Sequence, residues 1–221
     1  MQNPELTSRR EALASRLGSV VDGPHVLSSL EELKPYECDG LAAYRVVPLL
    51  VALPGSTEEV QAVLRICNEE RVPVVARGAG TGLSGGALPV ENGVLLSLAR
   101  LNRILAIEPD NCCARVQPGV RNLAISEAAK PHGLYYAPDP SSQIACSIGG
   151  NVAENAGGVH CLKYGLTVNN LLAVEMITIE GERVTLGGGG LDGPGYDLLA
   201  LATGSEGMLG VVVEVTVKLL P

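Results

Sequence analysis

The chain has 221 residues, is 46% hydrophobic and 18% charged, and carries a formal net charge of −8. This length and composition indicate a folded chain with a sizeable core and exclude an intrinsically disordered one. The acidic balance argues against nucleic-acid binding, which depends on basic patches.

The six cysteines contain no C-x-x-C pair, so we expect neither a zinc or iron–sulfur framework nor another metal site. The N-terminus lacks the apolar stretch of a signal peptide, and no run reaches the roughly 18 apolar residues of a membrane-spanning helix. The sequence therefore predicts a cytoplasmic protein with free thiols and no transmembrane segment.

Hydrophobic periodicity and turn residues define the expected elements. In chain order they are a helix over 6–17, an irregular segment over 22–45, a strand over 48–53, a helix over 57–70, a strand over 72–76, a glycine-rich loop over 78–86, strands over 94–98, 104–107 and 114–117, a helix over 121–130, a loop-rich region over 137–165, a hairpin over 172–186, a flexible turn over 187–190, a helix over 196–203 and a strand over 209–219. The β-α-β unit over 48–76 predicts a parallel pair of strands with a right-handed crossover.

These elements predict an α+β fold with two lobes. Residues 1–45 form an N-terminal helix and an irregular lead-in, and the main domain covers 46–221. Its first lobe, about 46–108, is a small β-α-β lobe, and its second, about 113–221, has a mainly antiparallel sheet with flanking helices. Because the chain stops directly after a strand, we expect it to be a truncated piece of a longer protein.

The segment after the strand over 72–76 is glycine-rich and reads RGAGTGLSGG from Arg77 to Gly86. It matches G-x-G-x-x-G, but no helix follows, as a Rossmann site requires, and it has no lysine, as a P-loop requires. Closely spaced glycines let backbone N–H groups point into one concavity, and Thr81 and Ser84 add hydroxyl donors, which suits a pyrophosphate. The alternative is a flexible surface loop without a ligand.

A second constellation contains PDPSS (138–142) and SIGGNVAENAGG (147–158). Its glycine pair leads into a predicted helix, whose N-terminus suits a ligand phosphate or carbonyl. Asn151 and Asn155 lie four residues apart and would share one face of this helix, where their amides suit a ligand with donors and acceptors. The alternative is an ordinary capped helix. In a third segment, TGSEGMLG (203–210), Glu206 is either a turn residue or a ligand contact.

The ordered set of these segments resembles the FAD-binding (PCMH-type) domain of the vanillyl-alcohol oxidase / p-cresol methylhydroxylase superfamily, over about residues 48–221. Three further segments, PYECDGLAAYR (35–45), QPGVRNLAISEA (117–128) and GGVHCLKYGLTVNNL (157–171), are similar to the flavoprotein D subunits of bacterial glycolate oxidases, which are FAD-linked D-2-hydroxy-acid dehydrogenases. That closer resemblance covers nearly the whole chain.

The resemblance implies a set of FAD-binding residues. The pyrophosphate would be held by Gly78, Ala79, Gly80, Thr81, Gly82, Leu83, Ser84, Gly85 and Gly86. The flavin would be lined by Pro138, Asp139, Ser142, Gly149, Gly150, Asn151 and Asn155, and the rest of the cofactor by Gly157, Gly158, Glu206, Gly210 and Val211. Some superfamily members bind FAD covalently through a histidine in the first loop. Because this loop has none, we expect non-covalent FAD.

The resemblance also implies the oxidation of glycolate or another D-2-hydroxy acid to the 2-keto acid, by hydride transfer to flavin N5. Its implied partners are an iron–sulfur subunit that passes electrons to quinone and a second flavoprotein subunit, through which the protein would associate peripherally with the membrane. Because the substrate domain is expected to be missing, we expect this fragment to be inactive alone. No general base is assigned. His160 is a candidate for catalysis, with a structural role as the alternative.

Two other functions stay open at this point. One is a non-catalytic FAD-binding subunit that relays electrons or assists assembly within such a complex, and the other is a binder of another nucleotide without a redox role. Lys163 and Tyr164 either contact FAD or are structural. Arg45 and Arg77 either offset ligand charge or form surface ion pairs.

Overall fold

The computed structural model describes residues 4–188 and 195–221. The chain forms two compact units, the first made of Met1–Arg100 with Thr178–Glu182 and the second of Leu101–Ile177 with Arg183–Pro221. Two residues of the expected turn over 187–190, Gly189 and Gly190, lie outside the described residues. No helix within the described ranges combines the length and apolar character needed to cross a membrane.

The first unit contains a four-stranded sheet in the order β1-β2-β4-β3. Its elements are α1 (Pro4–Gly18), β1 (Val26–Leu27), α2 (Leu30–Leu33), β2 (Leu50–Ala52), α3 (Thr57–Glu69), β3 (Val74–Arg77) and β4 (Val94–Ser97). The β-α-β unit is present, but β2 and β3 do not pair with each other. Instead, β4 lies between them and is parallel to both. The two strands are thus parallel, as predicted, but they are not neighbours in the sheet.

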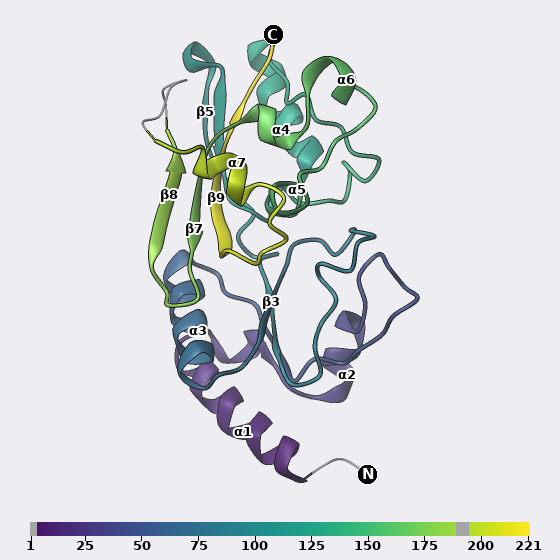
Figure 1. Ribbon diagram of the computed structural model, residues 1–221, viewed down its shortest axis with the longest axis vertical. Helices are drawn as coiled ribbons and strands as arrows, with labels where there is room; N and C mark the ends of the chain where they lie inside the picture. Colours follow the sequence, from purple (N-terminus) through teal and green to yellow (C-terminus); the bar gives the residue numbers. More distant parts are fainter. Residues whose placement is uncertain (1–3, 189–194) are drawn as a thin grey trace. The chain divides into compact units, whose positions relative to one another are not determined.

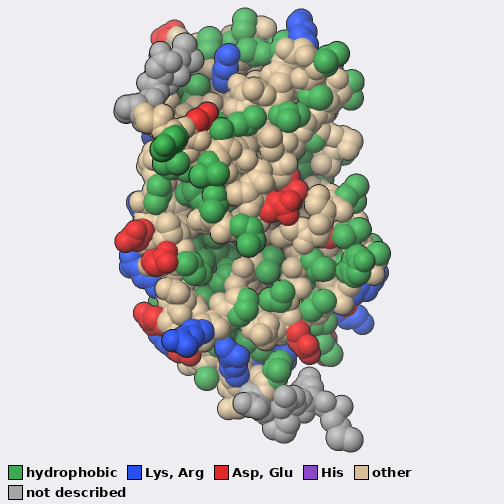
Figure 2. Space-filling view, in the orientation of Figure 1, with side chains coloured by type: hydrophobic (Ala, Val, Ile, Leu, Met, Phe, Trp, Pro, Cys, Tyr) green, Lys and Arg blue, Asp and Glu red, His purple; other side chains and the backbone are tan. Residues whose placement is uncertain are grey.

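Helix α3 begins where the sequence places a cap. The Ser56 hydroxyl accepts a hydrogen bond from the N–H of Glu59 at 3.2 Å, which satisfies one of the free donors of the first turn. One face of α3 is buried, and Arg16 of α1 forms ion pairs with Glu69 and Glu70 at the end of α3. Figure 2 shows basic and acidic side chains next to one another over the unit that carries these helices.

The second unit contains a five-stranded antiparallel sheet in the order β5-β6-β9-β7-β8. Its elements are β5 (Ile104–Glu108), β6 (Cys113–Val116), α4 (Asn122–Ala129), α5 (Ile148–Glu154), α6 (Cys161–Tyr164), β7 (Leu171–Ile177), β8 (Arg183–Gly187), α7 (Leu198–Ala202) and β9 (Val211–Lys218). Figure 1 shows α5 beside β9.

Strand β9 forms the centre of this sheet, paired with β6 on one side and β7 on the other. Its side chains alternate, with Val211, Val213, Val215 and Val217 buried, as expected for a strand with one face on the core. The two later valines belong to a cluster that includes Ile125 of α4 together with Ile148 and Val152 of α5. The helices that carry site residues are therefore anchored on this sheet.

The α+β class with two lobes is confirmed, but the expected boundary between the lobes is not where the structure divides. Strand β5 pairs with β6 in the second sheet, so the first unit ends at Arg100 and not near residue 108. The lead-in also belongs to the first unit, because β1 pairs antiparallel with β2. A strand's partner depends on distant residues, so the pattern of β5 alone gives no indication of its sheet.

Candidate functional site

The glycine-rich loop, Gly78–Gly86, follows β3 directly and offers a row of free donors. Within the described part of the chain, no hydrogen-bond acceptor is found for the backbone N–H of any residue in this loop. Gly80 and Gly85 have φ of +68° and +83°, which favour glycine. Nine consecutive N–H groups in a half-buried to exposed loop can therefore bind an anion.

The lead-in packs against this loop. Nη1 of Arg77 donates to the carbonyl of Cys38 at 2.7 Å, and its guanidinium lies 5.8 Å from the ring centroid of Tyr36. A Cβ on Gly40 would lie 2.5 Å from the carbonyl oxygen of Gly82, so only glycine permits this approach. The segment 36–41, which was expected to be part of an irregular lead-in, thus forms one wall of the loop.

Asp39 stands in this wall and is 6% exposed. Its Oδ1 accepts a hydrogen bond from the N–H of Leu41 at 2.8 Å. Its Oδ2 is buried, and no donor among the described residues reaches it. A buried carboxylate oxygen without a donor is unfavourable for the protein by itself.

The two arginines singled out in the sequence differ in their roles. Arg45 forms an ion pair with Glu37 at 2.6 Å, and this pair raises the pKa of the exposed guanidinium. Of the two roles considered for Arg45, ligand contact and surface ion pair, the structure shows the surface ion pair. Arg77 instead fixes the lead-in to the loop.

In the second unit, a buried amide network joins α4 and α5. Nδ2 of Asn122 donates to the carbonyl of Pro138 at 3.1 Å and to Oδ1 of Asn151 at 3.0 Å. Nδ2 of Asn151 donates to Sγ of Cys146 at 3.3 Å. Since Asn151 is 4% exposed and its amide is used internally, it does not present that amide to a ligand as the sequence analysis expected.

The N-terminus of α5 has no free donors. The N–H groups of Ile148 and Gly149 donate to the carbonyls of Val120 and Pro118, both at 2.8 Å, and that of Gly150 donates to the Ser147 hydroxyl at 3.4 Å. The expected binding of a phosphate or carbonyl at this helix N-terminus is therefore not available without breaking internal bonds. A ligand could contact Gly149 and Gly150 only by packing against their backbone, and not by accepting hydrogen bonds from these N–H groups.

The C-terminus of α5 is capped by the segment that contains Glu206. The N–H groups of Gly204 and Glu206 donate to the carbonyls of Val152 and Ala153 at 2.8 and 2.9 Å, which satisfies acceptors that a helix end leaves free. Glu206 has φ of +52° and an exposed side chain. Its turn role is present in the structure, and its side chain stays accessible to a ligand.

The residues that follow α5 fix a neighbouring loop. Asn155 caps the helix with φ of +49°, and its Oδ1 accepts from the N–H of Val168 at 3.0 Å. No acceptor in the described part of the chain is found for its amide nitrogen. Asn155 and Asn151 thus do not share one helix face. Gly210 is packed against β7, where a Cβ would lie 2.7 Å from Cε of Met176, and Val211 is buried at the start of β9.

Asp139 of PDPSS is tied to the segment after α5. Its Oδ2 lies 2.6 Å from Nδ1 of His160, and its Oδ1 accepts from the His160 N–H at 3.2 Å. A Cβ on Gly158 would lie 2.2 Å from Oδ1 of Asp139, so this glycine permits the approach. Burial raises the pKa of Asp139, but the hydrogen bonds from His160 outweigh it, and the net shift is downward.

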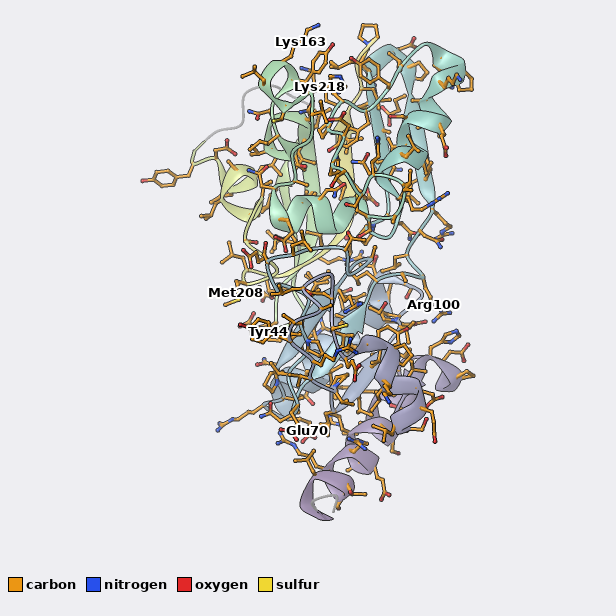
Figure 3. All side chains as sticks on the ribbon, turned by 90° about the vertical axis from the view of Figure 1, so that its right-hand side faces the viewer. Tyr44, Glu70, Arg100, Lys163, Met208 and Lys218 are labelled. Carbon is orange, nitrogen blue, oxygen red and sulfur yellow. The ribbon has the colours of Figure 1, made fainter. Side chains whose placement is uncertain are left out.

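Tyr164 links His160 to two further side chains. Its ring centroid lies 6.5 Å from that of His160 and 6.3 Å from that of Tyr135, and Nζ of Lys163 lies 4.8 Å from it. Hydrogen bonds from Tyr135 and then Lys163 lower the pKa of Tyr164, and the same Tyr135 bond raises the pKa of Tyr135. Figure 3 shows Lys163 pointing away from the ribbon.

The structure thus gathers most predicted site residues into two groups, one in each unit. Three members of the second group remain. Pro138 is buried, the carbonyl of Ser142 accepts from the N–H groups of Ala145 and Cys146, and Gly157 lies where a Cβ would be 2.7 Å from Cδ2 of Leu166. Sequence reasoning missed Asp39, Gly40 and Asn122. The Asp-Gly pair in an otherwise irregular stretch was a signal for the first two. For Asn122, the only signal in the sequence was a polar residue at the start of a predicted helix.

Among the described residues, no group of His, Cys, Asp and Glu side chains is placed to hold a metal ion.

Comparisons with known proteins identify the family. The model of the FAD binding domain matches residues 48–187. The chain is 68% identical over 212 residues to the glycolate oxidase subunit GlcD of Escherichia coli (strain K12), a match that covers 96% of this chain and 42% of that protein. It is 42% identical over 185 residues to a D-lactate dehydrogenase of Anaerostipes hadrus, covering 83% of this chain and 39% of the relative. The chain thus spans about two fifths of the length of these curated relatives.

A solved structure shows the same fold. Alkyldihydroxyacetonephosphate synthase superposes on 100% of this chain with a TM-score of 0.82, at 22% sequence identity, and the match covers 41% of that protein. At this identity, the likeness supports the fold alone.

The residues present fit FAD at the glycine-rich loop. A diphosphate is anionic and takes several donors, and the loop presents consecutive backbone N–H groups without internal acceptors. Gly40 approaches the carbonyls of Thr81 and Gly82 so closely that a side chain there would collide with the loop. With the family model matching residues 48–187, this chain belongs to the FAD binding domain family, and its cofactor is FAD.

Proposed function

We propose that this chain is the FAD-binding portion of a flavin-dependent oxidoreductase that oxidises glycolate or another D-2-hydroxy acid to the 2-keto acid. The observation that carries the proposal is the row of free N–H groups in Gly78–Gly86. The similarity to a glycolate oxidase subunit and to D-lactate dehydrogenases supports this substrate class. Bound FAD supplies, at flavin N5, the acceptor for the hydride that leaves C2 of the hydroxy acid.

In this proposal, the chain's own residues bind and orient the cofactor. The loop Gly78–Gly86 holds the pyrophosphate through backbone N–H groups, without a covalent bond, because no histidine is present in it. In the second unit, the backbone around Pro138, Asp139 and Gly158 and the free amide nitrogen of Asn155 line the flavin. Asn151 supports the flavin site without contacting the flavin, because its buried amide fixes α4 to α5.

His160 remains a candidate for proton transfer in this proposal. Its Nδ1 faces Asp139, and its side chain is 63% exposed, so Nε2 is free to meet a substrate or water. An Asp-held imidazole has the arrangement of a general base whose orientation is fixed by a carboxylate. We assign no other general base to this chain.

The partners and location are further parts of the proposal. An iron–sulfur subunit would take the electrons on to quinone, and a second flavoprotein subunit would complete the complex. A cytoplasmic location, with membrane association only through these subunits, agrees with that assembly. Relatives named as glycolate oxidase subunits support a multi-subunit enzyme.

The direct test is a visible spectrum of the purified chain after it is mixed with FAD and desalted, repeated on the supernatant after acid precipitation. We expect a stoichiometric flavin band that acid releases completely. The control is Gly18→Ala, since nothing lies within 4 Å of an added Cβ there. A folded chain that retains no flavin would contradict the proposal, and a band that stays with the precipitate would contradict its non-covalent part.

Substrate oxidation needs a second assay. We expect the chain alone not to reduce a dye with glycolate or D-lactate, because it spans only about two fifths of its relatives. Dye reduction by the isolated chain with either acid would show that its own residues complete a substrate site. That result would contradict the expectation that substrate oxidation needs residues outside this chain.

A further inference from the structure

Asp39 holds a carboxylate that the described residues satisfy only in part. Oδ1 accepts a hydrogen bond from the N–H of Leu41, whereas Oδ2 is buried, and no donor from residues 4–188 or 195–221 reaches it. The side chain is 94% buried, since its exposed fraction is 6%. A buried anionic oxygen has lost its hydration, so it favours a donor from elsewhere.

The position of Asp39 is fixed by contacts on both sides of it. The preceding carbonyl, that of Cys38, accepts from Arg77, and the following residue, Gly40, lies against the carbonyls of Thr81 and Gly82. Each of these contacts leads to the glycine-rich loop or to the residue that precedes it. The backbone on both sides of Asp39 is therefore held in the wall of the proposed pyrophosphate site.

The charge of Asp39 selects the kind of group that it can receive. A phosphate would place like charges together, so the carboxylate does not take the diphosphate itself. A neutral hydroxyl donates readily to a carboxylate, and such bonds are among the stronger hydrogen bonds in proteins. In FAD, sugar hydroxyls flank the diphosphate on both sides, on the ribose and on the ribityl chain.

From these three observations we infer that Asp39 binds the cofactor by accepting a hydrogen bond from one of its sugar hydroxyls at Oδ2. This inference rests on the proposed function, because it takes the ligand at the loop to be FAD. It adds a residue of the lead-in, outside the segment matched by the family model, to the binding site.

Asp39→Asn tests the inference with almost no change of shape. The amide can keep the contact to Leu41, but it replaces the free acceptor with an NH2 donor. We expect the dissociation constant for FAD, measured by flavin fluorescence, to rise about tenfold or more. The matched control is Glu91→Gln, an exposed carboxylate of the same unit, which should change it less than about twofold.

A melting curve without FAD separates binding from structure. If Oδ2 is satisfied only when a ligand binds, Asp39→Asn removes a buried charge that the protein alone satisfies only in part. The apo variant should then melt at the same temperature as the unmodified chain or higher. A variant that melts lower without FAD, or that fails to fold, would overturn the inference, because the carboxylate would then serve the protein alone. Equal FAD affinity of variant and unmodified chain would overturn it as well.

Competition with adenine nucleotides identifies the hydroxyl. If the ribose is the donor, ADP should lose affinity for Asp39→Asn, and the unmodified chain should bind 2′,3′-dideoxy-ADP more weakly than ADP. If the ribityl chain is the donor, both proteins should bind ADP equally, while FAD alone shows the loss. A folded, unmodified chain that binds no FAD would instead overturn the proposed function, and the inference with it, before any variant is compared.

Discussion

Nδ1 of His160 lies 2.6 Å from Oδ2 of Asp139, and the backbone N–H of His160 donates to the other carboxylate oxygen of the same aspartate. Asp139 thus receives a side-chain and a backbone contact from one residue 21 positions away. The pair fixes the segment that leads into α6 onto PDPSS. Gly158 is the residue that makes this possible, because a side chain there would occupy the space of the carboxylate.

The pair predicts a pH dependence of stability. The hydrogen bonds from His160 lower the pKa of Asp139 in the folded chain against the opposing effect of burial. A group whose pKa is lowered by folding stabilises the folded state above its unfolded pKa, near 3.9 for aspartate. That contribution is lost as the pH falls through the folded value.

Asp139→Asn should therefore lower the free energy of unfolding at pH 6 by about 1 kcal/mol or less, because His160 is largely exposed. The difference between the two proteins should begin to shrink as the pH falls below about 4, where the unfolded carboxyl is protonated, and should disappear only when the folded carboxyl is protonated at its lower pKa. Urea unfolding at both pH values measures it, with Asp110→Asn as the exposed control. A difference that grows on acidification would contradict the argument.

Gly158→Ala should destabilise the chain by about 1 to 3 kcal/mol, because overpacking forces the backbone apart. The added Cβ would lie 2.4 Å from the backbone carbonyl carbon of Asp139, and rigid backbone cannot move aside cheaply. Thermal unfolding followed by circular dichroism gives the measurement. Gly188→Ala is the control in the same unit, since nothing lies within 4 Å of its added Cβ, and it should melt like the unmodified chain.

Much of the fold could be predicted because local patterns are strong in this chain. Helix α3 has a serine cap, an acidic first turn and a buried face at helical spacing, and β9 alternates with a period of two. The glycine-rich loop could be located because glycines clustered between two strands are costly without a use. Each of these signals is contained within about a dozen residues.

What the sequence could not predict depends on contacts between distant segments. The order of the strands places β4 between β2 and β3, and nothing in their apolar runs distinguishes the neighbours. Asn151 was expected to face a ligand, but its amide is buried and hydrogen-bonded to Asn122, which lies 29 residues away in the sequence. The wall formed by the segment 36–41 was missed for the same reason, since Arg77, which binds the carbonyl of Cys38 in this wall, lies 39 residues further along.

The Asn122 network predicts a large effect from a buried polar change. Asn122→Ala would leave the carbonyl of Pro138 without its donor, and Oδ1 of Asn151 with only the weak thiol donor of Cys146 at 3.7 Å. We expect a loss of about 2 to 4 kcal/mol in the free energy of unfolding, measured with urea, because unsatisfied buried acceptors are costly. Asn111→Ala, which removes an exposed bond to Glu108, should cost less than about 0.5 kcal/mol. Similar losses for the two variants would contradict the importance of burial.

Gly80→Ala should weaken FAD binding more than it weakens folding. The residue has φ of +68°, and an added Cβ would lie 2.3 Å from Nη2 of Arg77, so the loop and the guanidinium must both shift. We expect about a tenfold or greater rise in the dissociation constant, since the N–H groups would no longer converge. Flavin fluorescence titration measures it, and Gly18→Ala should bind FAD as the unmodified chain does. Unchanged affinity for Gly80→Ala would place the pyrophosphate elsewhere.

The cysteines should differ widely in reactivity. Cys67 is fully buried on α3, and burial raises the pKa of its thiol to about 12, so almost no thiolate forms at pH 8. Cys38, Cys112 and Cys161 are partly exposed. Treatment with iodoacetamide at pH 8, followed by peptide mass mapping, should therefore modify these three first and Cys67 only after unfolding in urea. Rapid labelling of Cys67 in the folded chain would mean that α3 opens readily from the sheet, because the thiol has no other route to the reagent.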